Sequence, residues 1–151
     1  MKKLFVTYLF FSMFGITVYA AELNVSQYML NFPEPRISDL EAGYLDYDRY
    51  SGGNHVRLMV NVDANTKWNI YIYSEQPALY SGQYDIAIEK LLWKLAIQPS
   101  TGYRPVTMNK TLLMSGSGSY TIDLNYRLLL DWSTLPGFYN IQVFYDLEIL
   151  E

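Results

Sequence analysis

The feature that most constrains the fold is the alternation of apolar and polar residues near the C-terminus. From position 139 to 149, every second residue is aliphatic or aromatic, and most of the residues between them are polar. The first set is Tyr139, Ile141, Val143, Tyr145, Leu147 and Ile149, and the second is Asn140, Gln142, Asp146 and Glu148. Successive side chains of a strand point to opposite faces, whereas the apolar positions of a helix recur every three or four residues. The pattern predicts one long strand with all six residues of the first set facing the core.

The same alternation recurs along the chain. It predicts strands over residues 23–29, 56–62, 68–73, 106–114 and 120–128, and it places Tyr120 and Tyr126 on the core face of the last of these. Turn-forming residues at 64–67 predict a hairpin between the second and third strands. Ser-Gly repeats at 115–119 predict a flexible loop, and Leu135-Pro136-Gly137 predicts a connection before the terminal strand.

Residues 86–97 fit two patterns. Ile88, Leu91, Leu92 and Leu95 would share one side of a helix, but the segment also alternates as two short strands with a break near Glu89-Lys90. Two strands are favoured because the neighbouring segments are strands and no N-cap residue precedes the segment. The chain is therefore predicted to be all-β, a single two-sheet sandwich of about seven or eight antiparallel strands.

The N-terminus has the three parts of a cleavable signal peptide. Lys2 and Lys3 precede an apolar run, and Val18 and Ala20 fit the small residues before a cleavage site. Residues 1–20 are thus predicted to be removed, leaving one domain over 21–151 that is secreted, periplasmic or displayed at the cell surface. A retained anchor is the alternative. No second long apolar stretch follows, so no membrane span is expected after cleavage.

Composition restricts the partners of the mature chain. Because the leader carries two lysines and no acid, 9 Lys and Arg face 15 Asp and Glu after its removal. An acidic surface repels phosphate, so no nucleic acid is expected as a partner. The chain has no cysteine, so its stability must come from a hydrophobic core rather than from disulfides.

The residues that carry chemistry are few. His55 is the only histidine; it could join Asp48 and Ser51 in a triad, but an exposed loop position is favoured. Glu41, Asp46 and Asp48 could offer oxygen ligands to calcium, although their spacing fits a solvated acidic loop better. Paired acids could also hydrolyse a glycoside, but nothing fixes such a pair. The chain is predicted to have no catalytic residues, no metal site and no cofactor.

Tyrosine is unusually frequent, with 15 in the chain. Tyr44, Tyr47 and Tyr50 lie in a predicted loop, and Tyr71 and Tyr73 share the outer face of a predicted strand. Exposed aromatic rings suit stacking on sugars or anchoring a protein interface, so these five residues form a candidate binding surface. The alternative is that outward tyrosines are ordinary strand formers.

The segment Asn65-Thr66-Lys67-Trp68-Asn69-Ile70 is followed by Leu91-Leu92-Trp93, a Gly-Ser turn, a long tyrosine-bearing strand and then Leu135-Pro136-Gly137-Phe138-Tyr139 before a terminal strand. This order resembles that of immunoglobulin-like β-sandwiches of bacterial surface and pilus-subunit proteins. The chain departs from pilus subunits in having no cysteine pair and in carrying a complete terminal strand. The resemblance implies an immunoglobulin-like sandwich fold. Export, the sandwich pattern and the lack of a catalytic set predict a non-catalytic structural or adhesive subunit of the cell envelope, pilus-like in kind. The edge strands of a sandwich have free backbone groups, which can pair with a copy or with another envelope protein. The alternative is a secreted carbohydrate-binding module that uses the tyrosines.

Overall fold

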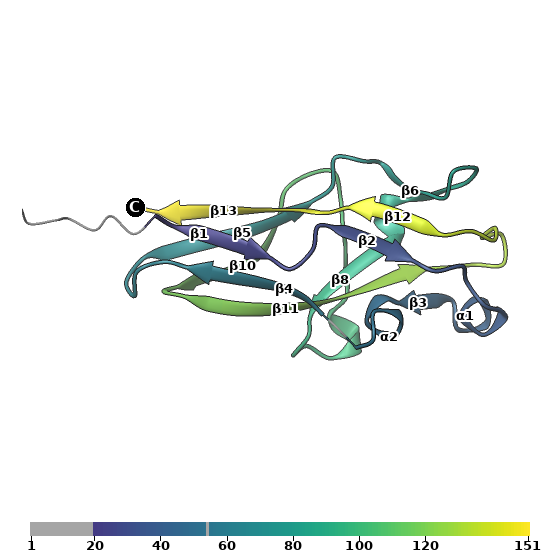
Figure 1. Ribbon diagram of the computed structural model, residues 1–151, viewed down its shortest axis with the longest axis horizontal. Helices are drawn as coiled ribbons and strands as arrows, with labels where there is room; N and C mark the ends of the chain where they lie inside the picture. Colours follow the sequence, from purple (N-terminus) through teal and green to yellow (C-terminus); the bar gives the residue numbers. More distant parts are fainter. Residues whose placement is uncertain (1–19, 54) are drawn as a thin grey trace, which may run out of the picture.

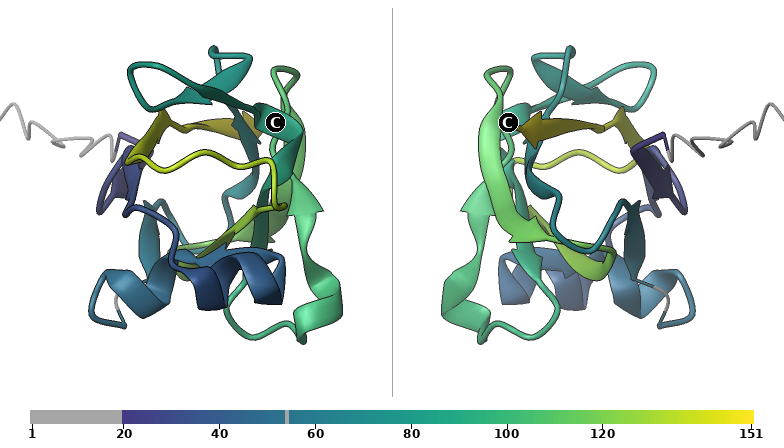
Figure 2. Two further views of the ribbon diagram at one scale, coloured as in Figure 1. Left: turned by 90° about the vertical axis from the view of Figure 1, so that its right-hand side faces the viewer. Right: turned by 90° about the vertical axis from the view of Figure 1, so that its left-hand side faces the viewer.

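The computed structural model describes residues 20–53 and 55–151, and it describes the backbone but not the side chain of Tyr50. The predicted signal peptide lies outside these residues apart from Ala20. In the described part, the chain is mostly β-strand, every strand pair is antiparallel, and the sheets enclose a common core (Figures 1 and 2).

The described strands form three sheets. The six-stranded sheet has the order β1 (Glu22–Val25), β4 (Val56–Asn61), β11 (Tyr120–Leu129), β8 (Leu91–Leu95) and β9 (Arg104–Pro105), with β3 (Tyr44–Asp46) also paired to β11. The three-stranded sheet has the order β10 (Thr111–Ser117), β5 (Lys67–Tyr73) and β13 (Phe144–Leu150). The four-stranded sheet has the order β2 (Met29–Phe32), β12 (Tyr139–Gln142), β6 (Ala78–Tyr80) and β7 (Asp85–Ala87). The all-β prediction is confirmed, but the described residues form thirteen short strands in three sheets rather than seven or eight in two.

The predicted hairpin between residues 56–62 and 68–73 is wrong. β4 pairs with β1 and β11, whereas β5 pairs with β10 and β13 in another sheet. Each strand has one apolar face. The connection between them places the two strands in different sheets with these faces towards the core, so Leu58 of β4 and Ile70 of β5 are both fully buried. Alternation shows that a strand has a core face, but it does not show whether the next strand lies beside it or across the core.

Two tyrosines join the six-stranded and three-stranded sheets across the core. Tyr126 on β11 and Tyr145 on β13 are buried, and their hydroxyl groups are hydrogen-bonded to each other. Burial raises the pKa of both phenols above the ordinary value for tyrosine. Because these side chains point towards each other, the outer faces of the two sheets lie on opposite sides of the molecule.

The terminal strand is divided at Val143. β12 pairs with β2, and β13 pairs with β5, so the chain passes from the four-stranded to the three-stranded sheet. Tyr139, Ile141, Val143 and Tyr145 are buried as predicted. Leu147 is half-buried against the core and Ile149 is 40% exposed, so the prediction that all six face a closed core is wrong at the end of the strand.

Three other predicted segments differ from the structure. Residues 23–29 form β1 and the start of β2, because the chain changes sheet near Ser26. The predicted strand 106–114 begins only at Thr111. The Ser-Gly segment is largely strand, since β10 runs to Ser117 and turns at Gly118, where φ is 68°. A Cβ on Gly116 would lie 2.4 Å from Trp68 Cζ2, so glycine is required there for the indole to pack.

The prediction for residues 86–97 is confirmed, whereas the loop predicted around Tyr44, Tyr47 and Tyr50 is wrong. Residues 86–97 contain β7 and β8, separated by a 3₁₀ turn at Ile88–Lys90, so the favoured interpretation of two strands is confirmed. The predicted loop around the first tyrosines instead contains α1 (Ile37–Ala42), β3 and α2 (Tyr47–Tyr50). α1 is capped at its C-terminus by Gly43, whose φ of 79° is readily adopted by glycine. Both helices lie on one side of the molecule (Figure 2).

Candidate functional site

The five candidate tyrosines are not brought together. Tyr71 and Tyr73 lie on the outer face of the three-stranded sheet, and Tyr44 lies on the outer face of the six-stranded sheet. Tyr47 is in the core, 9% exposed, so the expectation of an exposed ring there is wrong. Its ring packs edge-on against Phe32 of β2, with the two ring centroids 5.4 Å apart. The side chain of Tyr50 lies outside the described part of the chain.

Tyr44 belongs to a stack that the sequence did not reveal. The guanidinium carbon of Arg127 lies 3.7 Å from the centroid of the Tyr44 ring and 4.4 Å from that of Tyr103. Arg127 also donates two hydrogen bonds to the carboxylate of Asp46, at 2.6 and 3.0 Å. Burial, with a further contribution from the Asp46 charge, raises the pKa of Tyr103 to about 12. The stack holds β3 and the segment before β9 against β11, and Arg127 occupies one face of the Tyr44 ring.

The outer face of the three-stranded sheet carries two repeats of one contact. Tyr71 Oη donates to Glu148 Oε2 at 2.8 Å, and Tyr73 Oη donates to Asp146 Oδ1 at 3.4 Å. The register places Tyr71 opposite Asp146 and Tyr73 opposite Phe144. Each hydroxyl therefore reaches the carboxylate that lies two residues beyond its directly opposite partner on β13. In the sequence, the alternation near the C-terminus already places Asp146 and Glu148 on the outer face of the terminal strand, where they are able to meet outward tyrosines of a neighbouring strand.

A hollow of about 530 Å³ adjoins this face beside β13. Its lining includes Leu23, Tyr28, Tyr71, Lys110, Asp146 and Glu148, and we call it the β13 hollow. Lys110 is ion-paired with Asp146, and its Nζ lies 5.4 Å from the centroid of the Tyr73 ring. Burial and the Asp146 charge raise the pKa of Tyr73. Three tyrosines, two carboxylates and one ammonium thus line an open concavity; the tyrosines are Tyr28, Tyr71 and Tyr145.

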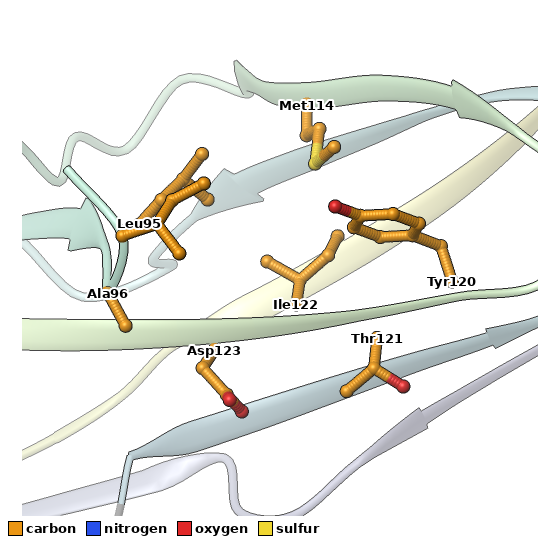
Figure 3. Close-up of a pocket in the computed structure, with 8 residues that line it drawn as sticks. Leu95, Ala96, Met114, Tyr120, Thr121, Ile122 and Asp123 are labelled. Atoms are coloured by element: carbon orange, nitrogen blue, oxygen red, sulfur yellow. The ribbon is translucent and has the colours of Figure 1, made fainter.

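A second concavity lies at the opposite edge of the same sheet. It has a volume of about 120 Å³ and lies between β10 and β11, with Leu95, Met114, Tyr120 and Ile122 pointing into it (Figure 3). We call it the β10 pocket. Thr121 and Asp123 point to the other side of β11 (Figure 3). Tyr120 lies at this opening and is 47% exposed, so its predicted burial is wrong.

The strand edges beside the β10 pocket lack partners in the described part of the chain. β10 pairs only with β5. On β11, the residues that pair with β8 begin at Leu124, which lies opposite Leu95. One further hydrogen bond joins Ala96 N to Asp123 O. Ile97, which also lines the pocket, is 89% exposed. Free backbone groups and exposed apolar side chains therefore occur together at this edge.

His55 lies in an exposed position, as predicted, beside a hollow that Ser26 and Asp123 also line. The carboxylate of Asp123 accepts two hydrogen bonds from Arg57, at 2.7 and 3.0 Å, and this pairing lowers the pKa of Asp123. Ser26 Oγ accepts from the backbone N–H of Arg57. No hydrogen bond joins His55 to Ser26 or Asp123 in the described part of the chain, so these three side chains do not form an aligned triad. The partners considered from the sequence, Asp48 and Ser51, lie in α2 and directly after it, where Ser51 Oγ donates to Asp48 O at 3.3 Å.

The predicted acidic loop is dispersed by the fold. Asp46 is held by Arg127, Glu41 is exposed on α1, and Asp48 lies in α2. Among residues 20–53 and 55–151, no group of three His, Cys, Asp or Glu side chains is placed to hold a metal ion. No helix within these residues has both the length and the apolar character needed to cross a bilayer.

Comparisons of the chain with protein-family models, with curated proteins and with solved structures found no match. The function of this protein must therefore be inferred from its own residues and their geometry.

Proposed function

We propose that this protein is an exported, non-catalytic structural or adhesive subunit of the cell envelope that associates through an edge of its β-sandwich. The observation that carries the proposal is the β10 edge, where the side of β10 away from β5 has no partner strand among the described residues and borders an apolar pocket. Edge strands with free backbone groups are templates for pairing with another chain, and natural proteins commonly protect them with charge, proline, bulges or a covering segment. β10 has a bulge between Leu112 and Met114, but it has no charged residue and no proline between Thr111 and Ser117.

The proposed partner is a second copy of the chain. Ile97, Tyr120 and Leu112 are 89%, 47% and 46% exposed, which leaves apolar area near this edge in contact with water. Covering such area is favourable by about 25 cal/mol per Å². Backbone pairing would set the register of the partner strand, and the β10 pocket would receive an apolar side chain from it.

Export and fold type form the rest of the proposal. We place the mature chain, residues 21–151, in a secreted, periplasmic or surface location on the basis of the N-terminal pattern. The two opposed sheets joined by Tyr126 and Tyr145 support a relationship to the immunoglobulin-like sandwiches of bacterial surface proteins. Intact-mass measurement of the exported protein tests the first part: a chain that begins at Ala21 is expected, and one that retains Met1 would contradict it.

Sedimentation velocity over a wide concentration range tests self-association. The mature chain should form oligomers as its concentration rises. Ile97→Lys should weaken association by at least about tenfold, which corresponds to about 1.4 kcal/mol, because it places a charge in the interface. The matched control is Ile37→Lys, since Ile37 is 70% exposed on α1, away from the β10 edge.

Ile97→Lys should leave the thermal melting temperature nearly unchanged, because the side chain is almost fully exposed. A mature chain that remains monomeric at every concentration would overturn the proposal of self-association. Oligomers that respond equally to both substitutions would show that the interface lies away from β10.

A further inference from the structure

The outer face of the three-stranded sheet has a chemistry that self-association at β10 does not use. Tyr71 and Tyr73 are two residues apart on β5, so their side chains leave the strand about 7 Å apart on the same face. Each hydroxyl bonds to a carboxylate on the neighbouring strand. These bonds draw the rings across β13 instead of leaving them free to rotate, so the rings are held in position before any ligand arrives.

The carboxylates are held in position as well. Glu148 Oε2 accepts from Tyr71 and, at 3.2 Å, from the amide of Asn69. Asn69 in turn accepts from Ser115 Oγ at 2.7 Å, so the network crosses all three strands of the sheet. A carboxylate can accept several hydrogen bonds, and these contacts leave acceptor capacity on Glu148. The face thus presents fixed acceptors beside fixed aromatic rings.

The β13 hollow adds a concave surface of suitable size. Its volume of about 530 Å³ lies within the usual range of small-ligand sites, roughly 300–1,000 Å³. Tyr28, which is 43% exposed, supplies a further ring at the hollow. Lys110 supplies a hydrogen-bond donor, and its positive charge already compensates that of Asp146. Of the two carboxylates that line the hollow, Glu148 is the one without an ion pair in the described part of the chain.

We infer that the β13 hollow and the adjoining Tyr71 face bind a neutral oligosaccharide. A pyranose ring has an apolar C–H face that suits an aromatic ring, and its hydroxyl groups suit fixed carboxylate acceptors and a lysine donor. A phosphorylated or sulfated ligand is disfavoured because two carboxylates line the hollow and only one ammonium faces them. The site lies at the β13 edge, so the inference does not depend on association at the β10 edge.

Isothermal titration calorimetry of the mature chain with three neutral probes tests the inference. Cellohexaose, maltohexaose and the β-1,4 hexamer of N-acetylglucosamine differ in linkage and substituents, and at least one should bind saturably. Tyr71→Ala should weaken that binding by at least about tenfold, because it removes the ring. Tyr71→Phe keeps the ring and should retain more affinity than Tyr71→Ala.

Tyr84→Ala is the matched control, since Tyr84 is 42% exposed in the connection between β6 and β7 of another sheet. It should leave affinity unchanged, and so should Ile97→Lys at the β10 pocket. Thermal melts of each variant show that the fold is retained, and Glu148→Gln, which keeps the size of the side chain, provides a second test if Tyr71→Ala is unstable. Glu148→Gln should lower affinity measurably.

Failure to bind any of the three oligosaccharides would overturn the inference, as would binding that Tyr71→Ala and Glu148→Gln leave unchanged. Saturable binding of the diamine putrescine without binding of an oligosaccharide would show that the hollow recognises cations, and would also overturn it. None of these outcomes bears on the sedimentation result, so the two proposals fail separately.

Discussion

The two edges of the three-stranded sheet, β10 and β13, flank the same central strand but differ in chemistry. The β10 edge has an apolar pocket, a bulge between Leu112 and Met114, and no charged residue within the strand. The β13 edge carries Asp146 and Glu148, which are bonded to tyrosines of β5. One sheet thus has an apolar, uncharged edge on one side of β5 and a polar, hydrogen-bonded edge on the other, which is why we propose a different partner for each.

The two edge strands are also anchored in different ways. β13 enters the sheet directly after Val143, which is fully buried, and its first inward residue, Tyr145, bonds to Tyr126 across the core. β10 is anchored by the close approach of Gly116 to Trp68, whose Nε1 donates to Gly118 O at 2.8 Å.

Val143→Asp should have the largest effect. It places a carboxylate without a partner in the core, and we expect it to cost more than about 4 kcal/mol, which is most of the roughly 5 kcal/mol that holds a domain at the low end of ordinary stability folded. Gln142→Asp is the neighbouring control and should be mild, because that side chain is only half-buried. Thermal melts of both variants provide the measurement, and similar melting temperatures would show that the anchor of β13 is misplaced.

Gly116→Ala should have an intermediate effect at the other edge. The added methyl group would overlap the Trp68 ring, which is held by its hydrogen bond to Gly118, so a destabilisation of about 1–3 kcal/mol is expected. Ser117→Ala, at an exposed position of the same strand, should change stability by less than about 0.5 kcal/mol. Urea unfolding measures both free energies. A neutral Gly116→Ala would mean that β10 is not anchored through the indole.

The smallest expected effect is a loss of stability at alkaline pH, and it comes from the pair Tyr126 and Tyr145 beneath β13. Burial raises the folded-state pKa of Tyr126 and Tyr145, whereas unfolded tyrosine titrates near pH 10. The folded state therefore holds these protons more tightly, so this contribution to stability is complete below about pH 10 and is lost as the pH rises above it. Urea unfolding from about pH 8 to pH 11 should show the decline. The Tyr126→Phe, Tyr145→Phe double variant should show a weaker decline, and an unchanged pH dependence would contradict the buried pair.

Much of the local structure could be predicted from the sequence. The alternation in 120–128 and 139–145 identifies residues that are buried, with Tyr120 as the exception, and the break at Glu89-Lys90 separates two strands. Alternation depends only on which side of a strand meets water, and that preference is a local property of the chain. The helices at 37–42 and 47–50 were missed because such short helices depend on packing more than on periodicity.

The candidate site was only partly predictable. Tyr71 and Tyr73 were identified as outward residues of one strand, and the outward Asp146 and Glu148 were identified on another. That these four side chains meet depends on the pairing of β5 with β13, two strands separated by some seventy residues. The Tyr44, Arg127 and Tyr103 stack joins three distant segments in the same way, and no local pattern points to it.

The sequence by itself determined that the chain is all-β, that its stability is independent of disulfides, and which face of each major strand is apolar. Only the tertiary structure decided which strands are neighbours, that the connection at 64–67 crosses the core, that Tyr47 is buried, and that the terminal strand serves two sheets. The physical reason is that burial preference is encoded residue by residue. Strand pairing is instead chosen by the free energy of the whole core, to which residues far apart in the sequence contribute together.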